Sequence, residues 1–444
     1  MAETLTSLST CIVKPSTPTP PQHMFLSAAD CFWRWFHYNQ RILFFKVDQN
    51  QPLSHLNFVI SHLKASLASA LVEFFPWAGR VFEQEDGRLA LDCNDAGVPF
   101  IEAYIDMPFS ALEKDGFQHR PFFKHFTPHG DVTKWNGPDD PLLSIQVTRF
   151  PRDEGFVLGI GHSHIVADGA SLWHFMKSWG ECARGVALSM PPVHMREALR
   201  PETLILPPPR PEEENVDVGP SPFEIAGDEL LVQRDFHFTS EMVNKLKDMA
   251  STSSPVVGHA PFSAVQALGA HMWKHVVAAT DTDKSRHCIF YVMSNMRSKL
   301  EPPLPEAYFG NAVFRDGAVA RKEEIKEESV GAIALRIQKV VKRIDEKKFR
   351  TFYGNFEVLP FKELFDEAEF KMVFMQVSGS PRFPVYEVDF GWGPPSCVRS
   401  PNIRGNGEMV WTCGREGGGS IDVTLALSKP VMEMLEQDES FLSI

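Results

Sequence analysis

The sequence contains no closely spaced pair of cysteines, although it has seven cysteines in 444 residues. The count is odd and no Cys-x-x-Cys pair occurs, so a disulfide framework and a structural zinc site are both disfavoured. Free thiols are typical of a reducing compartment, and we expect a cytoplasmic protein. No stretch approaches the roughly 18 apolar residues of a membrane helix, and residues 1–22 lack the apolar run of a signal peptide.

Positive charge is also scarce, because 44 Lys and Arg stand against 57 Asp and Glu, for a formal net charge of -13. An acidic chain repels phosphate backbones, which disfavours a nucleic-acid partner. A phosphorylated small ligand is still allowed, since a local basic patch can override the overall charge. An apolar content of 43% is enough for sizeable cores and excludes a disordered chain.

A proline- and glutamate-rich stretch divides the chain, because residues 190–221 contain three successive prolines and three successive glutamates. Proline is excluded from helix interiors and central strands, so this stretch is the best candidate for a linker. We expect an N-terminal domain over residues 1–190, a crossover linker over 191–229 and a C-terminal domain over 230–444. Scattered strands and helices in both halves predict two α/β domains.

Hydrophobic periodicity predicts strands and helices in both halves of the chain. Residues 142–150 and 155–161 are strand-like and are separated by a short turn, so they are expected to pair. Residues 170–184 predict an amphipathic helix that ends at Gly185. Further helices are expected at 62–73, 240–250 and 263–279, and further strands at 88–93, 230–238, 288–294, 370–377 and 420–427.

The segment GHSHIVADG at residues 161–169 directly follows the second of these strands. A neutral imidazole suits proton removal from an alcohol or amine near pH 7, and a strand running through a tight turn into a helix holds such a base rigidly. His164 is therefore a candidate general base. Asp168 either orients the imidazole, as in a catalytic triad, or turns away and fixes the loop through an arginine. The spacing alone is also compatible with a structural histidine at a strand end.

A second motif, DFGWG, occupies residues 389–393 and is followed by two prolines. Taken alone, it is also compatible with a structural loop in which glycine permits positive φ and the aromatic rings fill a core. In their order and spacing, HSHIVADG and DFGWG together resemble the BAHD acyltransferase family of plants. Three further stretches agree with that family's pattern: FPWAGR at 75–80, Ser178-Trp179 after the motif helix, and NMRSKLEPP followed by YFGN over 295–311.

Within the family, the segments on both sides of DFGWG most resemble the branch that includes the protein defective in cuticular ridges. The hydroxycinnamoyl branch carries Thr-Ser-Trp ahead of DFGWG, whereas this chain has Ser378-Gly379-Ser380. The tryptophan of that branch helps to hold substrate groups. Its absence here argues against a shikimate or quinate acceptor.

The resemblance implies two similarly sized α/β domains related to chloramphenicol acetyltransferase, with an active-site tunnel at their interface. It implies an acyl-CoA donor as co-substrate, no bound cofactor, a small-molecule acceptor and a monomer. The product is an ester or amide of a plant specialised metabolite or cuticle precursor. His164 deprotonates the acceptor, while Asp168 and Gly169 are structural, with Asp168 pairing with Arg297.

The resemblance also gives DFGWG a structural or CoA-side role through Asp389, Gly391, Trp392 and Gly393. Candidate contacts with CoA or substrate are Ser253, Ser254, Ser263, Ser378, Ser380 and Arg382. Ser263 is equally compatible with a plain helix N-cap. Trp392, Ser378 and Ser380 are also candidate donors to the oxyanion.

Three other features are weaker candidates. Trp33 and Trp35 are compatible with core positions and, from the resemblance, with the acceptor side. His162 shares a strand face with His164 and is either a packed residue or a second base. No metal site is expected, because His271 and His275 lack a third ligand nearby. Two other hypotheses stay open: lyase-type chemistry on the same scaffold with His164, and a non-catalytic binding protein.

Overall fold

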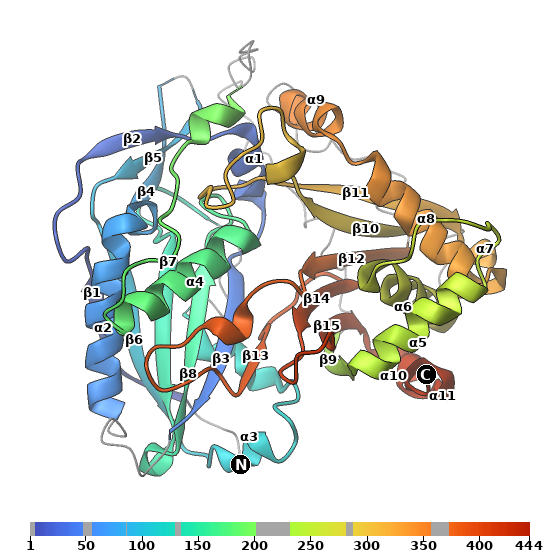
Figure 1. The fold of residues 1–444 in the computed structure, drawn as a ribbon. Coiled ribbons are helices and arrows are strands. Elements are labelled where there is room, and N and C mark those ends of the chain that lie inside the picture. The colour runs from blue at the N-terminus through green and yellow to red at the C-terminus, as the bar shows by residue number, and fades with distance from the viewer. Residues whose placement is uncertain are drawn as a thin grey trace, which may run out of the picture. The chain divides into compact units, whose positions relative to one another are not determined.

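The computed structural model describes residues 5–47, 56–85, 87–128, 135–200, 231–280, 287–356 and 373–444. The chain forms two compact units of comparable length, each built on a six-stranded sheet with helices (Figure 1). The predicted α/β class is therefore confirmed. No helix in the described part of the chain is both long and apolar enough to cross a lipid bilayer.

The first unit combines residues 1–214, 302–312 and 384–402. Its main sheet has the order β1-β6-β7-β8-β3-β13, and a second sheet has the order β2-β5-β4. The strands are β1 (Leu5–Val13), β2 (Gln22–Phe25), β3 (Asn39–Lys46), β4 (Arg80–Glu83), β5 (Leu89–Cys93), β6 (Val98–Ile105), β7 (Leu143–Arg149), β8 (Gly155–His162) and β13 (Cys397–Arg399). The helices are α1 (Ala28–Cys31), α2 (Leu56–Glu73), α3 (Ser110–Glu113) and α4 (Gly169–Ala183).

Strand β8 lies between β7 and β3 and is antiparallel to both. Its pairing with β7 is the one that the sequence predicted. All eight of its residues are buried, because both faces of this central strand are covered. Helices α2 and α4 pack together on one face (Figure 1), joined by a hydrogen bond from Trp179 Nε1 to Ser66 Oγ. A phenylalanine-rich cluster that includes Phe44, Phe123 and Phe126 forms a second part of the core.

The second unit combines residues 215–301, 313–383 and 403–444. Its sheet has the order β11-β10-β12-β14-β15-β9. The strands are β9 (Leu231–Phe238), β10 (His287–Asn295), β11 (Val313–Arg321), β12 (Val373–Gly379), β14 (Glu408–Cys413) and β15 (Ile421–Ser428). The helices are α5 (Ser240–Thr252), α6 (Ala264–Ala279), α7 (Lys322–Glu327), α8 (Val330–Arg343), α9 (Glu346–Phe356), α10 (Lys429–Glu436) and α11 (Glu439–Leu442).

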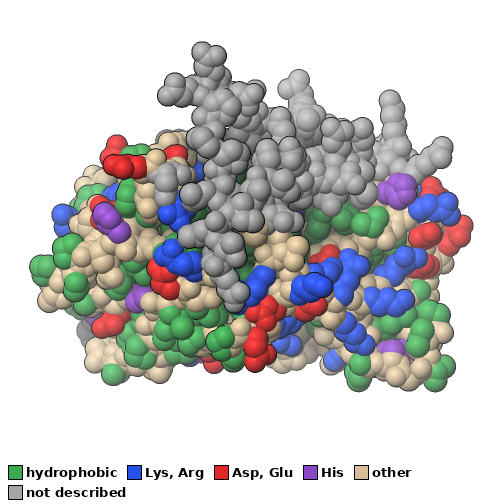
Figure 2. Space-filling view, turned by 90° about the horizontal axis from the view of Figure 1, so that it is seen from above, with side chains coloured by type: hydrophobic (Ala, Val, Ile, Leu, Met, Phe, Trp, Pro, Cys, Tyr) green, Lys and Arg blue, Asp and Glu red, His purple; other side chains and the backbone are tan. Residues whose placement is uncertain are grey.

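Acidic and basic side chains occur side by side on the face drawn in Figure 2. Within the second unit, the structure pairs Arg343 and Lys348 with Asp316, at 2.8 and 2.6 Å. These contacts lower the pKa of Asp316, against the opposing effect of its burial. Surface ion pairs of this kind contribute little to stability individually.

Each unit is built from three separate segments of the chain, whereas two continuous domains joined by a linker were expected. The DFGWG segment, expected in the C-terminal domain, lies in the first unit, because β13 pairs with β3 of the N-terminal sheet. Residues 191–200 of the expected linker also pack in the first unit, where Arg196 is buried. The rest of that linker, from residue 201, lies outside the described residues.

Candidate active site

His164 lies in the turn between β8 and α4, as the sequence predicted. Asp168 is the N-cap of α4, and its Oδ1 accepts a hydrogen bond from Ser171 N at 2.9 Å. Its second oxygen accepts one from Ala312 N at 3.0 Å. A carboxylate at a helix N-terminus satisfies otherwise unpaired N–H groups and stabilises the helix. Asp168 therefore links the turn that carries His164 to residues 308–312.

Ser171, in the first turn of α4, makes a second link to the same segment. Its hydroxyl accepts from Gly310 N at 3.1 Å and donates to Gly310 O at 2.9 Å. Asp168 N also donates to Gly310 O. These bonds hold residue 311, which follows, beside the imidazole of His164.

Asn311 contacts the imidazole directly, with His164 Nδ1 and Asn311 Oδ1 separated by 2.9 Å. The polarity of the amide follows from its other contacts. Its Nδ2 lies within hydrogen-bond distance of three acceptors, Asp30 Oδ1 at 2.9 Å, His164 O at 2.8 Å and Ile165 O at 3.3 Å. An NH₂ group is required there, so Oδ1 faces the ring and accepts a hydrogen bond from Nδ1–H.

The result is a defined tautomer of His164, with the proton on Nδ1 and the lone pair on Nε2. Nε2 has no hydrogen bond to any residue that the structure describes. Burial lowers the pKa of His164 to about 4, against the raising effect of Asp168. The imidazole is therefore neutral near pH 7 and able to accept a proton.

Two ring side chains, those of Trp33 and His162, lie next to His164. Trp33 stacks on the imidazole of His164, with ring centroids 3.7 Å apart and an interplanar angle of 19°. Trp33 is 9% exposed, so it is both a core residue and a wall of the candidate site. His162 is buried edge-on against Trp77, and burial lowers its pKa well below the usual value.

The DFGWG motif lies away from His164, at the other end of β8 and α4. The ring of Phe390 packs on Trp179 near the end of α4, and the ring of Trp392 packs on Phe156 near the start of β8. Phe156 precedes His162 by six residues, which is roughly 20 Å along a strand. Trp392 is therefore too distant to donate to an oxyanion formed at His164, and that expectation is wrong.

The remaining residues of DFGWG form a turn. Asp389 Oδ1 accepts hydrogen bonds from Gly391 N at 2.8 Å and Gly393 N at 2.9 Å, and both glycines adopt positive φ. The backbone oxygen of Asp389 accepts a hydrogen bond from Arg184, just after α4. Asp389 thus has a structural environment within the first unit.

The serines proposed for CoA or substrate lie in the second unit, and several are engaged locally. Ser263 caps α6 in a capping box with Gln266. The hydroxyl of Ser253 donates to Met249 O at 2.6 Å and accepts from Gly331 N at 3.0 Å. Ser263 therefore has the N-cap role that its sequence context also allowed, Ser253 is held by local contacts as well, and contact with CoA stays a prediction for both.

The others occupy strand ends and turns. Ser378 Oγ donates to Glu408 Oε1 at 3.2 Å, and Ser380 Oγ accepts from the backbone N of the exposed Arg382. Ser254 bonds with the backbone of Val256. Arg297 is buried in the second unit and bonds to Asn295 Oδ1. Its pairing with Asp168 stays a prediction.

Sequence reasoning missed two buried charged residues, Asp30 and Arg196, and did not assign a role to Asn311. Asn311 was part of the recognised YFGN stretch, which was the available signal. Asp30 closes a Ser27-x-x-Asp30 capping box, a local pattern that says nothing of a partner 166 residues away. Among the described residues, no group of three or more His, Cys, Asp and Glu could hold a metal ion.

Comparisons with known proteins identify the family of the chain. A family model described as the Transferase family matches residues 3–442. BAHD acyltransferase DCR of Arabidopsis thaliana is 33% identical, over 97% of this chain and 90% of its own length. A hydroxycinnamoyltransferase of Narcissus pseudonarcissus is 32% identical, over 94% of this chain and 95% of its own.

Among solved structures, vinorine synthase superposes with a TM-score of 0.76 at 24% identity, over 99% of this chain and 98% of that one. This likeness confirms the fold expected from the sequence. The family model and the full-length relatives confirm the resemblance noted in the motifs. The chain belongs to the BAHD acyltransferases of the Transferase family, and it is an acyl-CoA-dependent acyltransferase.

Proposed function

We propose that His164 is the general base of this acyl transfer and that Nε2 is the atom that takes the proton. The observation that carries the proposal is the 2.9 Å contact between His164 Nδ1 and Asn311 Oδ1. It holds the proton of the neutral ring on Nδ1 and leaves the Nε2 lone pair for the acceptor. A base with this geometry contributes on the order of 10²- to 10⁴-fold to rate.

The reaction then needs no covalent enzyme intermediate. Nε2 removes the proton of an acceptor hydroxyl or amine as its oxygen or nitrogen attacks the thioester carbonyl carbon. The tetrahedral intermediate collapses, the carbon–sulfur bond breaks, and the CoA thiolate takes the proton from the imidazolium. Positioning donor and acceptor together supplies much of the remaining rate enhancement.

For substrates, we propose an acyl-CoA donor and a small-molecule acceptor from plant specialised metabolism or cuticle formation. One relative is named as a hydroxycinnamoyltransferase, and the other, BAHD acyltransferase DCR, agrees with the branch that the segments around DFGWG resemble. Their identities to this chain differ by one percentage point, so the choice of acceptor has to be made by assay.

The test offers purified protein a panel of acyl-CoAs with pooled phenolic, amine and hydroxy-fatty acceptors, and follows release of free thiol. We expect acceptor-dependent release by the wild type and its loss in His164→Ala. A surface variant, His23→Ala, is the matched control and should keep full activity. If no donor gives acceptor-dependent thiol release, the proposed substrates are wrong, and if His164→Ala keeps full activity, the base is another residue.

We also propose that the enzyme is a cytoplasmic monomer. All seven cysteines are free thiols in the structure, which supports a reducing compartment. A fluorescent fusion in plant cells tests the location, and sedimentation of the purified protein tests the monomer.

A further inference from the structure

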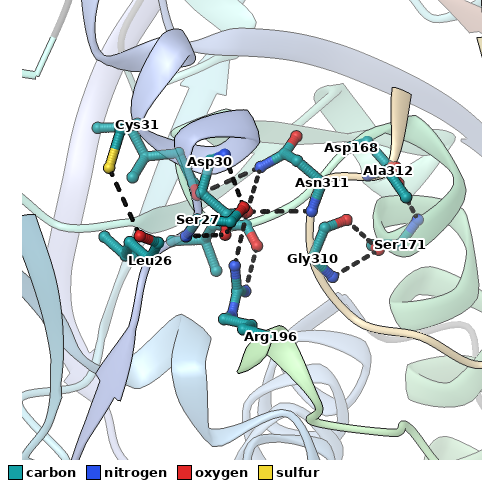
Figure 3. Close-up of polar contacts among 12 residues, drawn as sticks. Leu26, Ser27, Asp30, Cys31, Asp168, Ser171, Arg196, Gly310, Asn311 and Ala312 are labelled. Atoms are coloured by element: carbon teal, nitrogen blue, oxygen red, sulfur yellow. Dashed lines mark hydrogen bonds and ion pairs between the residues drawn. The ribbon is translucent and has the colours of Figure 1, made fainter. Parts of the chain in front are cut away.

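Asp30 is a fully buried carboxylate that makes more contacts than its helix requires. Its side chain is 0% exposed. One oxygen, Oδ2, completes the capping box of the four-residue helix α1 by accepting from Ser27 N at 2.9 Å and Ser27 Oγ at 2.8 Å. The cap uses only this oxygen. The other oxygen points to a different part of the fold (Figure 3).

Oδ1 of Asp30 accepts hydrogen bonds from two residues that are distant in sequence. Asn311 donates from N at 3.1 Å and from Nδ2 at 2.9 Å, and Arg196 donates from one guanidinium nitrogen at 2.8 Å. The Arg196 side chain is 1% exposed, so this ion pair is dry. A dry ion pair of this kind often adds little to stability compared with a neutral, well-packed pair.

The same groups hold the backbone of the catalytic turn. The second guanidinium nitrogen of Arg196 donates to Val166 O, and Asn311 Nδ2 reaches His164 O and Ile165 O. Three successive carbonyl groups, from residues 164 to 166, are therefore fixed by side chains that meet at Asp30. The network contacts His164 at its backbone and, through Asn311 Oδ1, at its ring.

The Asp30 carboxylate beside Asn311 Nδ2 favours one of the two orientations of the Asn311 side-chain amide. A hydrogen bond to a charged acceptor is roughly twice as strong as a neutral one. If the Asn311 amide were flipped, its carbonyl oxygen would face this carboxylate and two carbonyl groups, and its NH₂ group would face His164 Nδ1. The imidazole would then have to accept at Nδ1 and carry its proton on Nε2, the wrong tautomer for a base.

We propose that Asp30, with Arg196 as its counter-ion, is a positioning residue that sets the tautomer of His164 through Asn311. The inference rests on the proposed function, in which Nε2 is the base. Asp30 does not contact the imidazole, and its effect passes through the orientation of one amide. Arg196 pairs with the carboxylate away from solvent and at the same time fixes the turn through Val166 O.

A purely structural ion pair is the competing explanation, and the variants must separate the two. Removing Asp30 alone would leave a buried arginine unpaired, which is strongly destabilising and uninformative. The double variant Asp30→Asn/Arg196→Met removes both charges at similar volume. Lys64→Met/Glu102→Gln is the control, because it removes a second ion pair of the same unit, which is partly rather than fully buried, with atoms 2.6 Å apart.

The first measurement is the tautomer of His164, from nitrogen-15 shifts of histidine-labelled protein at pH 7, with His164→Ala to assign the signal. We expect the wild type and the control pair to show Nδ1–H, and Asp30→Asn/Arg196→Met to show a mixture that includes Nε2–H. The second measurement is kinetic. In the double variant we expect kcat to fall by about 10- to 100-fold with KM for acyl-CoA little changed, since only the base is affected.

The inference is overturned if the double variant keeps the wild-type tautomer and kcat and only unfolds at a lower temperature. It is also overturned if the wild type itself carries the proton on Nε2. The NMR result does not depend on acyl transfer. A tautomer change in the double variant, with no thiol release by any protein, would support the role of Asp30 while the proposed function failed.

Discussion

The two motifs of this protein lie at opposite ends of the same pair of elements, β8 and α4. The His164 end is polar, and it is held by three buried side chains, those of Asp30, Asp168 and Asn311. The DFGWG end is made of aromatic rings and glycines, with Phe390 buried between Trp179 and Phe45. Each motif was equally useful for recognising the family.

The difference teaches that a motif's value for recognition does not reveal its physical role. At the His164 end, hydrogen bonds determine where a proton sits. At the DFGWG end, backbone and ring contacts determine how α4 and β13 lie on the sheet. With roughly 20 Å of strand between them, substitutions at one end should leave the property controlled by the other unchanged.

The largest expected effect is at the His164 end, from Asn311→Ala. Without Oδ1, no group holds the proton of His164 on Nδ1, and the ring is free to change tautomer and orientation. We expect kcat to fall on the order of 10²-fold, with a loss of stability as well because Asp30 loses a donor. Steady-state kinetics on folded protein test this, with the exposed Asn94→Ala as control. An unchanged kcat would mean that Asn311 does not orient the base.

The next effect belongs to the DFGWG end, from Gly180→Val in α4. A Cβ at residue 180 would lie 2.6 Å from the backbone oxygen of Asp389, too close for any side chain without backbone movement. We expect the free energy of unfolding to drop by about 3 kcal/mol, while kcat per folded molecule stays within about twofold of wild type. Urea unfolding measures the first quantity. Gly137→Ala, which meets open space, is the control.

If Gly180→Val lowers kcat of the folded protein as strongly as Asn311→Ala does, the two ends are coupled and the comparison fails. Assays at low temperature, where the variant is folded, make this distinction possible.

How much of this could be read from the sequence differs between the two ends. The strand, turn and helix around His164 follow from local periodicity and were predicted within a few residues, because β8 and α4 are regular and buried on a clear pattern. The residues that hold His164 and its turn in place were not predicted. Asp30 and Arg196 are 166 residues apart and meet only in the folded chain, so no local pattern reports their contact.

At the DFGWG end, the sequence order itself was misleading. Residues 389–393 follow most of the second unit in the chain but belong to the first unit, because a three-residue strand, β13, pairs with β3. Such a short strand carries little periodic signal. The glycines of the motif were interpreted correctly as positions of positive φ.

The third prediction concerns pH and acts at the His164 end. The pKa of His164 is about 4 in the folded protein, below its usual value of 6.5, mainly because of burial. As pH falls below 6.5 the unfolded chain takes up a proton that the folded protein refuses until about pH 4. Stability is therefore lost between these values. For a partly exposed ring we expect a contribution on the order of 1–2 kcal/mol.

The measurement compares urea unfolding of wild type and His164→Ala at pH 7 and pH 5. Other histidines with lowered pKa that do not interact with His164, such as His194 and His271, are present in both proteins and cancel. We expect the alanine variant to lose less stability on acidification. In the same pH range kcat/KM of the wild type should stay level down to about pH 5, because His164 remains neutral. Equal acid sensitivity of the two proteins would contradict the lowered pKa.

The smallest expected effect is Asp389→Ala, at the DFGWG end. It removes the acceptor of two backbone hydrogen bonds, from Gly391 N and Gly393 N, in a partly exposed turn. We expect about 1 kcal/mol less stability and an unchanged kcat, because the carboxylate lies far from His164. Asp389→Asn keeps an acceptor oxygen in the same place and should be close to wild type in thermal unfolding. A loss of kcat that Asp389→Asn shares with Asp389→Ala, although its stability is close to wild type, would give this carboxylate a part in the reaction, and the motif would then be more than a support for α4.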